Sequence, residues 1–366
     1  MLAEQYQPDR CAALFDAKAQ AALEQLSPFS PPAPALFGSP PNGYRLRAEF
    51  RMWHDGDDLS YVMFPPGQRD APYVIDYFPI AGPKIAESME PLRLWLKDIP
   101  ALRRKLFQVE FLSTLSGELL ITLVYHRPLD EAWVAEAEGL AAQLNCKVIG
   151  RSRKQKITLR EDWVEETLNI GGDQFRYRQP EQCFTQPNGH INQKMAEWLM
   201  LHCERTHTDL LELYCGIGNF TFPLAKRFNR VLATELSKKA TEAARWNTAI
   251  NGTKNVEFAR LSAEEMTSAF SNTRHFRRLE HLSQPLNDYQ FSTLLVDPPR
   301  AGLDPATLKL AGGFERILYI SCNPKTLNEN LSHLVSTHQI EQLAFFDQFP
   351  YTEHLESGVI LKRRAI

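Results

Sequence analysis

Apolar and polar residues follow two different patterns along this chain. In the first half they mostly alternate, as in the strands of β-hairpins. Residues 9–26 place Ala, Leu and Phe at helical spacing, which predicts an amphipathic helix. The proline-rich segment 27–42 predicts a loop or connector. The alternating pattern then predicts a hairpin at 45–64, helices at 83–98 and 129–144, a second hairpin at 107–126, and a strand at 147–159. This order is typical of an α+β domain with a mostly antiparallel sheet.

From about residue 175 short apolar runs alternate with helical patterns. The predicted strands are 210–213, 231–234, 256–259, 292–296, 317–320, 340–347 and 358–363, and the predicted helices are 189–205, 219–227, 237–250, 262–270, 304–311 and 325–336. Such alternation predicts an α/β domain with a doubly wound, mainly parallel seven-stranded sheet. We therefore divide the chain into an α+β domain at 1–174 and an α/β domain at 175–366.

Composition narrows the classes of function. A chain of 366 residues has room for about two domains. No apolar run approaches the roughly 20 residues of a membrane span, and the polar first residues lack a signal-peptide core. We expect a cytoplasmic protein, a monomer, with no membrane partner. The six cysteines include no C-x-x-C pair, which argues against a disulfide framework, an iron–sulfur cluster or a bound metal.

Basic residues gather in the first half although the net charge is −3. One cluster includes Arg51, a second is the run 103–105 just before Phe107, and a third is the run 151–156. Each cluster alone is equally typical of solvated surface, but three in one domain favour a face that follows RNA phosphates. Phe107 is a candidate for stacking on a base, with a place in the core as the alternative.

Cys322 follows the apolar run 317–320, and Pro324 ends that strand because it has no N–H for the ladder. The cysteine is therefore expected at the carboxyl edge of the sheet, where ligands bind in α/β proteins. The alternative is a small buried apolar residue. Three further stretches, at 210–219, 231–235 and 294–300, favour a role in chemistry.

The first of these stretches is a strand followed by a glycine turn. Gly216 and Gly218 allow a sharp turn and close approach to a ligand, but Thr221 breaks the G-x-G-x-x-G pattern for a dinucleotide pyrophosphate. Glu235 ends the next strand, where an acidic side chain can accept two ribose hydroxyls; the alternative is a neighbour of a helix cap. A nucleoside without phosphate, such as S-adenosylmethionine, suits this combination.

Two loops supply further polar groups at the same edge. Asp297 follows the strand 294–296, two prolines stiffen the turn after it, and Arg300 is free to contact a phosphate or a carbonyl. The segment 348–358 lies between the last two strands and offers Glu353, His354 and Glu356 as acid–base candidates opposite Cys322.

These motifs together resemble the S-adenosylmethionine-dependent RNA uracil-5-methyltransferases. The resemblance covers nearly the whole chain and rests on the segments 47–51, 54–57, 184–188, 212–218, 297–300, 321–324 and 349–358. It implies a Rossmann-like methyltransferase domain after an RNA-recognition domain. It further implies Cys322 as nucleophile and Glu356 as base. A nucleophilic cysteine must be partly thiolate, and we expect the dipole of the helix 325–336 to help ionise it. The cofactor residues that the resemblance implies are Gln186, Tyr214, Asn219, Glu235 and Asp297.

The resemblance also implies a substrate. Ribosomal-RNA members of the family often carry an N-terminal RNA-binding barrel and a four-cysteine iron–sulfur motif, and this sequence has neither. That difference favours the tRNA branch, which methylates the T-loop uridine. We expect tRNA, through its T-arm, as the partner, together with other RNAs that have a T-like arm. Arg51, Phe107 and Arg300 are the candidate RNA contacts.

Three alternatives stay open at this point. The nearest is the same reaction on ribosomal RNA. The second is an RNA-folding factor whose main service is opening the tRNA elbow. The third, a small-molecule methyltransferase, leaves the basic α+β domain without a use.

Overall fold

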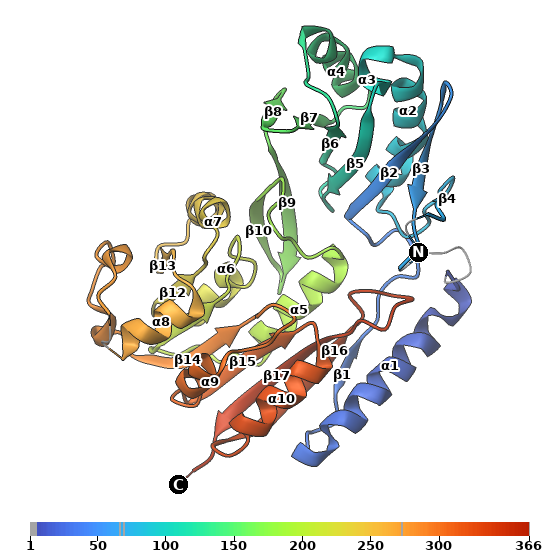
Figure 1. Cartoon of the computed structure of the whole chain (residues 1–366). Coiled ribbons are helices and arrows are strands. Elements are labelled where there is room, and N and C mark those ends of the chain that lie inside the picture. The colour runs from blue at the N-terminus through green and yellow to red at the C-terminus, as the bar shows by residue number, and fades with distance from the viewer. Residues whose placement is uncertain (1–5, 66, 69, 272–273, 366) are drawn as a thin grey trace.

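The computed structural model describes residues 6–65, 67–68, 70–271 and 274–365 of the chain, and Figure 1 shows its two large sheets and a two-stranded hairpin. The first sheet has seven strands in the order β4-β3-β2-β5-β6-β7-β8 within the described residues. Its strands are β2 (Arg47–Asp55), β3 (Asp58–Met63), β4 (Tyr73–Val74), β5 (Leu106–Ser113), β6 (Leu119–Tyr125), β7 (Lys147–Ser152) and β8 (Gln155–Thr158). The helices α2 (Pro83–Asp98), α3 (Pro100–Arg103) and α4 (Glu131–Gln143) share its core.

The second sheet carries the predicted α/β fold. In the described chain it has eight strands in the order β1-β16-β17-β15-β14-β11-β12-β13, and only β17 runs against its neighbours. Its strands are β1 (Ala35–Phe37), β11 (Asp209–Leu213), β12 (Val231–Thr234), β13 (Val256–Ala259), β14 (Phe291–Val296), β15 (Arg316–Ser321), β16 (His338–Phe346) and β17 (Glu356–Arg363). The expected mainly parallel sheet is confirmed.

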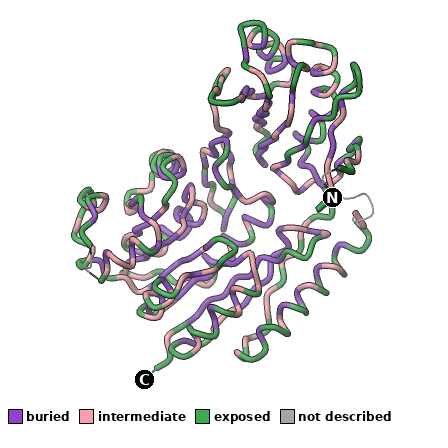
Figure 2. The backbone as a smooth tube through the Cα atoms, viewed as in Figure 1, coloured by how far each residue is buried: buried purple, intermediate pink, exposed green. Residues whose placement is uncertain are grey.

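Helices cover both faces of the second sheet. One face packs against α5 (Gly189–Leu201), α6 (Thr221–Ala225) and α7 (Lys238–Ile250). The other packs against α1 (Cys11–Leu26), α8 (Ala263–Phe270), α9 (Pro305–Ala311) and α10 (Pro324–Leu334). Figure 2 shows buried residues running along the strands between these layers. Strands buried on both faces explain the continuous apolar runs of the second half.

The N-terminal segment differs from the prediction. Residues 27–42 were expected to be loop, but Ala35–Phe37 forms β1, which pairs in parallel with β16 as an eighth strand. A three-residue strand between Pro34 and Gly38 gives too short a pattern to detect, and prolines are tolerated beside edge strands. Helix α1 also packs on this sheet. The first part of the chain therefore lies against the C-terminal sheet (Figure 1).

A separate hairpin joins the two halves. Strands β9 (Trp163–Ile170) and β10 (Asp173–Pro180) pair only with each other among the described residues, and the pattern analysis did not predict them. Their inward residues pack against α5 and α7. The expected boundary between 174 and 175 falls within β10, and the division into two domains remains a prediction.

Local signals place the helix starts. The Asp130 and Asp304 side chains accept hydrogen bonds from the first turns of α4 and α9, and Ser262 with Glu265 forms a capping box on α8. In the described part of the chain, no helix is long and apolar enough to cross a membrane.

Candidate active site

The order of strands in the second sheet changes direction between β11 and β14. After β11 the chain adds β12 and β13 on one side, and it then returns to place β14 and β15 on the other. Ligands bind outside the carboxyl edge at such a switch point. The loops that follow β11 and β14 carry residues 214–219 and Asp297, so the predicted cofactor residues flank the switch point.

The turn after β11 is held in a left-handed backbone conformation. Tyr214 has φ of 62°, and Gly216 and Gly218 have φ of 56° and 89°. A Cβ on Gly218 would lie 2.5 Å from the Phe222 ring, so this position requires glycine. A Cβ on Gly216 would meet no atom within 4 Å, so the turn borders open space. A left-handed non-glycine residue costs about 1–3 kcal/mol and is typical of ligand sites.

Glu235 joins this turn to the end of β12. Its Oε2 accepts a hydrogen bond from the Gly216 N–H at 3.1 Å, and its Oε1 accepts one from the Ser237 N–H at 2.7 Å. A carboxylate has about four lone-pair positions, so two remain for ribose hydroxyls. Glu235 is half-buried beside the open side of the turn. The cap-neighbour alternative is also partly true, because Ser237 is the N-cap of α7.

Two pairs of amide side chains line the approach to the turn. Asn219 exchanges two hydrogen bonds with Asn192 of α5, at 2.7 and 2.8 Å. Gln186 accepts a hydrogen bond from the Gln348 Nε2 at 2.6 Å. Gln348 is fully buried, and its own Oε1 has no hydrogen-bond partner among the described residues. That oxygen remains available to a donor on a bound molecule.

The residues at the switch point fit S-adenosylmethionine. The open space beside Gly216, the Glu235 acceptors and the unsatisfied Gln348 oxygen suit a nucleoside that has donor groups and no phosphate. Gln186, Tyr214, Asn219, Glu235 and Asp297 are the residues that would hold it.

Cys322 and Glu356 lie across neighbouring strands. β15 and β17 are antiparallel, and their last pair at this edge is Ser321 with Ser357. Cys322 follows the first of these serines and Glu356 precedes the second. Side chains alternate along a strand, so both residues share the face of Ile320, the face packed by α5 to α7. The structure therefore brings the two predicted catalytic residues together.

Accessibility separates Cys322 from the other cysteines. All six cysteines lie in the described chain as free thiols; Cys322 is half-buried and the other five are buried. Burial, the Glu356 charge and the Asp297 charge raise the pKa of Cys322 to about 11, while Arg300 lowers it. The help that we expected from the α10 dipole does not prevent this rise. In the protein alone the thiol is thus neutral near pH 7, which corrects the expectation of a partial thiolate.

Two carboxyl groups near Cys322 have raised pKa values as well. Burial and the Asp297 charge raise the pKa of Glu356 to about 8, with Arg300 opposing. Burial raises the pKa of Asp297 to about 7. Groups whose pKa lies near neutrality can take up and release protons during turnover. Glu356 is 4% exposed, whereas the alternative base Glu353 is exposed on the loop.

Arg300 lies beside the cysteine loop. Its carbonyl accepts hydrogen bonds from the Asn323 Nδ2 at 2.9 Å and the Thr326 Oγ1 at 3.2 Å. Its Nη2 lies 3.2 Å from the His354 Nε2, and because a guanidinium can only donate, the imidazole is the acceptor. His354 is therefore neutral with its lone pair engaged, which makes it a poor alternative base.

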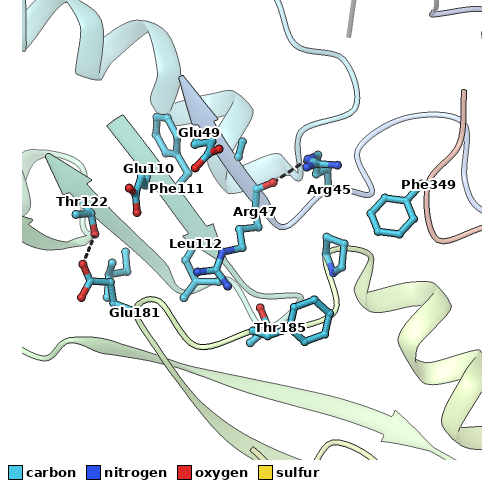
Figure 3. A pocket seen from close by; sticks show the side chains of 14 residues that line it. Arg45, Arg47, Glu49, Glu110, Phe111, Leu112, Thr122, Glu181, Thr185 and Phe349 are labelled. Atoms are coloured by element: carbon cyan, nitrogen blue, oxygen red, sulfur yellow. Dashed lines mark hydrogen bonds between the residues drawn. The ribbon is translucent and has the colours of Figure 1, made fainter. Parts of the chain in front are cut away.

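A cavity of about 340 Å³ lies between the first sheet and the segment 181–187, and Phe349 from the loop after β16 also lines it. Figure 3 shows Arg47 and Glu110 on the first sheet, Thr185 on the loop before α5, and Phe349 at one end. Gln186 follows Thr185, and Gln348 precedes Phe349. The cavity therefore adjoins the amide pair next to the cofactor residues.

Arg51 and Phe107 lie together on the first sheet. The Arg51 guanidinium lies 3.5 Å from the Phe107 ring centre, and His126 stacks on the same ring at 4.1 Å. Phe107 is half-buried, so it is neither a core residue nor an isolated wedge. Arg51 is exposed and forms no ion pair among the described residues. An RNA role for both residues remains a prediction.

In the basic runs 103–105 and 151–156, some side chains already form ion pairs within the protein. Arg103 pairs with Asp57 at 2.7 Å and donates to two backbone carbonyls. Arg151 binds the buried Glu181 through two hydrogen bonds of 2.5 and 2.6 Å, and Lys156 pairs with the same carboxylate at 3.2 Å. The run 151–156 therefore joins the first sheet to the loop after β10 and offers less free charge than expected.

Three residues at the site were not predicted as functional. They are Asn192, Gln348 and Glu212, the last only 2% exposed. Glu212 accepts a hydrogen bond from the Thr221 hydroxyl at 2.6 Å, and burial raises its pKa to about 8. A carboxyl in the middle of a buried strand was the available signal for Glu212. Asn192 and Gln348 have partners far away in sequence, so no local pattern marks them.

The fold, together with the family to which the chain belongs, defines the class: the protein is an S-adenosylmethionine-dependent methyltransferase. The tRNA (uracil-5-)-methyltransferase family model matches residues 10–364. This chain belongs to that family.

Curated relatives and a solved structure agree with this membership. A tRNA/tmRNA (uracil-C(5))-methyltransferase of Ectopseudomonas mendocina is 53% identical over 364 residues, 100% of both chains. One of Aromatoleum aromaticum is 54% identical over 339 residues, 93% of this chain and 92% of the relative. The crystal structure of Pyrococcus abyssi tRNA (uracil-54, C5)-methyltransferase with S-adenosyl-L-homocysteine has a TM-score of 0.70 at 21% identity, covering 95% of this chain and 83% of that chain. At that identity the likeness concerns the fold.

Proposed function

We propose that this protein methylates carbon 5 of the T-loop uridine of tRNA through a covalent intermediate on Cys322. The observation that carries the mechanism is the placement of Cys322 and Glu356 beside each other at the carboxyl edge. Family membership and the names of relatives that match the chain over its full length support tRNA as the substrate, and the T-loop position is part of the proposal.

Carbon 5 of uracil is a weak nucleophile, so it must be activated before it can accept a methyl group. A nucleophile of the protein does this by adding to carbon 6. Cys322 gives up its thiol proton to solvent, and the thiolate sulfur bonds to carbon 6, which moves the electrons of the C5–C6 double bond toward carbon 5 and the O4 enolate. S-adenosylmethionine, when bound, supplies the methyl group that carbon 5 receives. Glu356 then takes the proton from carbon 5. The double bond re-forms, the C6–S bond breaks, and Cys322 is released.

The raised pKa values determine how each group takes part in proton transfer. A thiol with a pKa of about 11 leaves roughly one molecule in 10⁴ ionised at pH 7, so attack on carbon 6 is coupled to loss of its proton. Glu356, with a pKa of about 8, is a stronger base than an ordinary carboxylate. Arg300, which lowers both pKa values, stabilises the negative charge that forms on either group.

The target base must leave its RNA stack to reach this edge. Extrusion costs a few kcal/mol, which contacts to the RNA backbone have to offset. The cavity between the first sheet and the segment 181–187 opens next to Gln186 and is a route for the base. Arg51 and Phe107 supply charge and an aromatic surface on the first sheet. Other RNAs with a T-like arm are further substrates, and we place the protein in the cytoplasm as a monomer.

The test is a methyl-acceptor assay with labelled S-adenosylmethionine. We expect transfer to an unmodified tRNA transcript and none when the T-loop uridine is replaced by cytidine. Ribosomal RNA of equal concentration should accept no label, and Cys322→Ala should abolish transfer to tRNA. Labelling of ribosomal RNA in preference to tRNA would overturn the substrate assignment.

A further inference from the structure

The loop 347–355 connects β16 to β17 and sets the position of Glu356. Gln348 and Phe349 at its start lie at the amide pair and the cavity, and Glu356 follows its last residue. A movement of this loop would displace the base that faces Cys322. The contacts that hold the loop therefore bear on catalysis.

One side chain from the N-terminal helix binds the loop at several points. The Lys18 Nζ, on α1, lies 2.5 Å from the Asp347 Oδ1. It donates to the carbonyl oxygens of Phe349, Thr352 and His354, at 3.1, 3.4 and 3.0 Å. The Lys18 side chain is only 13% exposed and that of Asp347 only 1%. The start, middle and end of the loop thus converge on one ammonium group.

The oxygen atoms around Lys18 are of the kind that bind a cation, and here the lysine ammonium is that cation. Three carbonyl dipoles and one carboxylate surround a common centre. The three N–H groups of the ammonium donate to the three carbonyl oxygens, and its charge compensates the carboxylate of Asp347 in an ion pair. Because the group is largely removed from water, its loss would leave the Asp347 charge buried and uncompensated. The carbonyl oxygens of Phe349, Thr352 and His354 would lose their common donor at the same time, so the start, middle and end of the loop would no longer be joined.

Other N-terminal residues support the same loop. The Tyr44 hydroxyl donates to the Pro350 carbonyl at 3.3 Å, and the Tyr351 hydroxyl donates to the Pro41 carbonyl at 2.5 Å. Tyr351 itself has φ of 65°, a conformation that needs such support. The loop is therefore supported by Lys18 on α1 and by the segment 41–44, whose Tyr44 packs in the core of the first sheet.

We propose that Lys18 is a positioning residue that holds the loop 347–355 so that Glu356 faces Cys322. This inference rests on the proposed function. Lys18 does not touch the target base, and it acts through the carbonyl groups that precede Glu356. The step that depends on it is removal of the carbon-5 proton, which follows methyl transfer. Loss of Lys18 therefore slows release of the covalent intermediate more than its formation.

The test compares Lys18→Met, which keeps the length of the side chain and removes its charge, with Lys18→Arg, which keeps both charge and donors. Lys309→Met is the matched control, because Lys309 is an exposed lysine on α9 that forms no hydrogen bond or ion pair with this loop among the described residues. Methylation of unmodified tRNA gives kcat and KM, and a denaturing gel of the quenched reaction gives the fraction of protein bound covalently to RNA.

We expect Lys18→Met to lower kcat by at least about tenfold, the loss typical of a displaced general base, with KM for tRNA and S-adenosylmethionine nearly unchanged. The covalent fraction should rise above that of the parent, and Lys18→Arg should restore most of kcat. Unchanged kcat in a folded Lys18→Met protein overturns the proposal. A covalent fraction that falls together with kcat also overturns the proposal, because such a fall means that the variant is defective in a step before adduct formation.

Two further variants separate a failure of this proposal from a failure to fold or a failure of the proposed function. If Lys18→Met does not fold, Asp347→Asn weakens the same contact while keeping its shape, and the same rise in covalent fraction is expected. Glu356→Gln on the same gel reports on the mechanism itself. Its failure to form an adduct contradicts the proposed function, whereas its success with no effect of Lys18 or Asp347 contradicts only the positioning role.

Discussion

Cys322 and Glu356 face each other across two antiparallel strands, one step beyond the pair formed by Ser321 and Ser357. The two groups influence each other's ionisation, because the Glu356 charge is the largest cause after burial of the raised pKa of Cys322. Pairing of the two strands holds Ser321 opposite Ser357, whereas Cys322 lies in the loop after β15 and Glu356 directly follows the loop 347–355. The separation of the two groups therefore depends on both loops.

The first prediction concerns this electrostatic coupling. Replacing Glu356 by Gln removes a negative charge near the thiol, so the pKa of Cys322 should fall. The effect should be visible above about pH 8, where Glu356 of the parent is ionised. Alkylation of Cys322 by iodoacetamide, followed by mass spectrometry, should then begin at lower pH in Glu356→Gln. Glu353→Gln, which changes an exposed carboxylate on the same loop, should leave the profile unchanged. Coincident profiles for Glu356→Gln and the parent would show that the charges are not coupled.

The second prediction concerns cofactor binding. Glu235→Ala removes the acceptors for two ribose hydroxyls, and hydrogen bonds to a charged group contribute about 1.5–3 kcal/mol each. Affinity for S-adenosylmethionine should fall by at least about tenfold, which corresponds to 1.4 kcal/mol. Affinity for tRNA should stay near that of the parent. Calorimetry measures the first and a filter-binding assay the second.

Glu242→Ala is the control for that measurement, because Glu242 is an exposed carboxylate on α7 with only a 3.7 Å surface contact to Lys238. Equal cofactor affinity for Glu235→Ala and the parent would mean that the ribose binds elsewhere.

The third prediction separates two arginines of the first sheet. Arg51 lies exposed over Phe107, whereas Arg103 is held by Asp57 and two carbonyl groups. Arg51→Ala should weaken tRNA binding and reduce the slope of log affinity against log salt by about one unit, the value for one phosphate contact. Arg103→Ala should leave the slope unchanged and lower thermal stability. An equal loss of slope in both variants would mean that Arg103 leaves Asp57 when RNA binds.

The surroundings of the loop 347–355 show most clearly which features could not be predicted from the sequence. The positions of Cys322 and Asp297 at strand ends follow from short apolar runs, because parallel strands place their carboxyl ends at one edge. The contacts of Lys18 and the pairing of β1 with β16 do not follow. They join segments about 300 residues apart, and a three-residue strand has no detectable period. The pKa of Cys322 was misjudged for a related reason: desolvation depends on packing and on carboxyl groups from other strands.

The last prediction tests the order of the chemical steps. If Cys322 attacks before methyl transfer and Glu356 acts after it, Glu356→Gln should still form the C6–S bond and methylate carbon 5. The carbon-5 proton then stays in place, so the thiolate cannot leave, and the protein remains joined to RNA. Incubation with unmodified tRNA and S-adenosylmethionine should give an RNA-retarded protein band on a denaturing gel, sensitive to ribonuclease. Cys322→Ser should give neither turnover nor adduct, because a hydroxyl is almost never ionised near neutral pH.

The double variant Cys322→Ser with Glu356→Gln is the control for that band, and it should migrate as free protein. Both single variants must still bind tRNA and cofactor for the comparison to count. If Glu356→Gln binds both and yet forms no adduct, Glu356 is not the base. The next candidate is then Glu353, since the His354 lone pair is already engaged by Arg300. An adduct that forms without cofactor would still support attack by Cys322, and it would show that nucleophilic addition does not wait for the methyl donor.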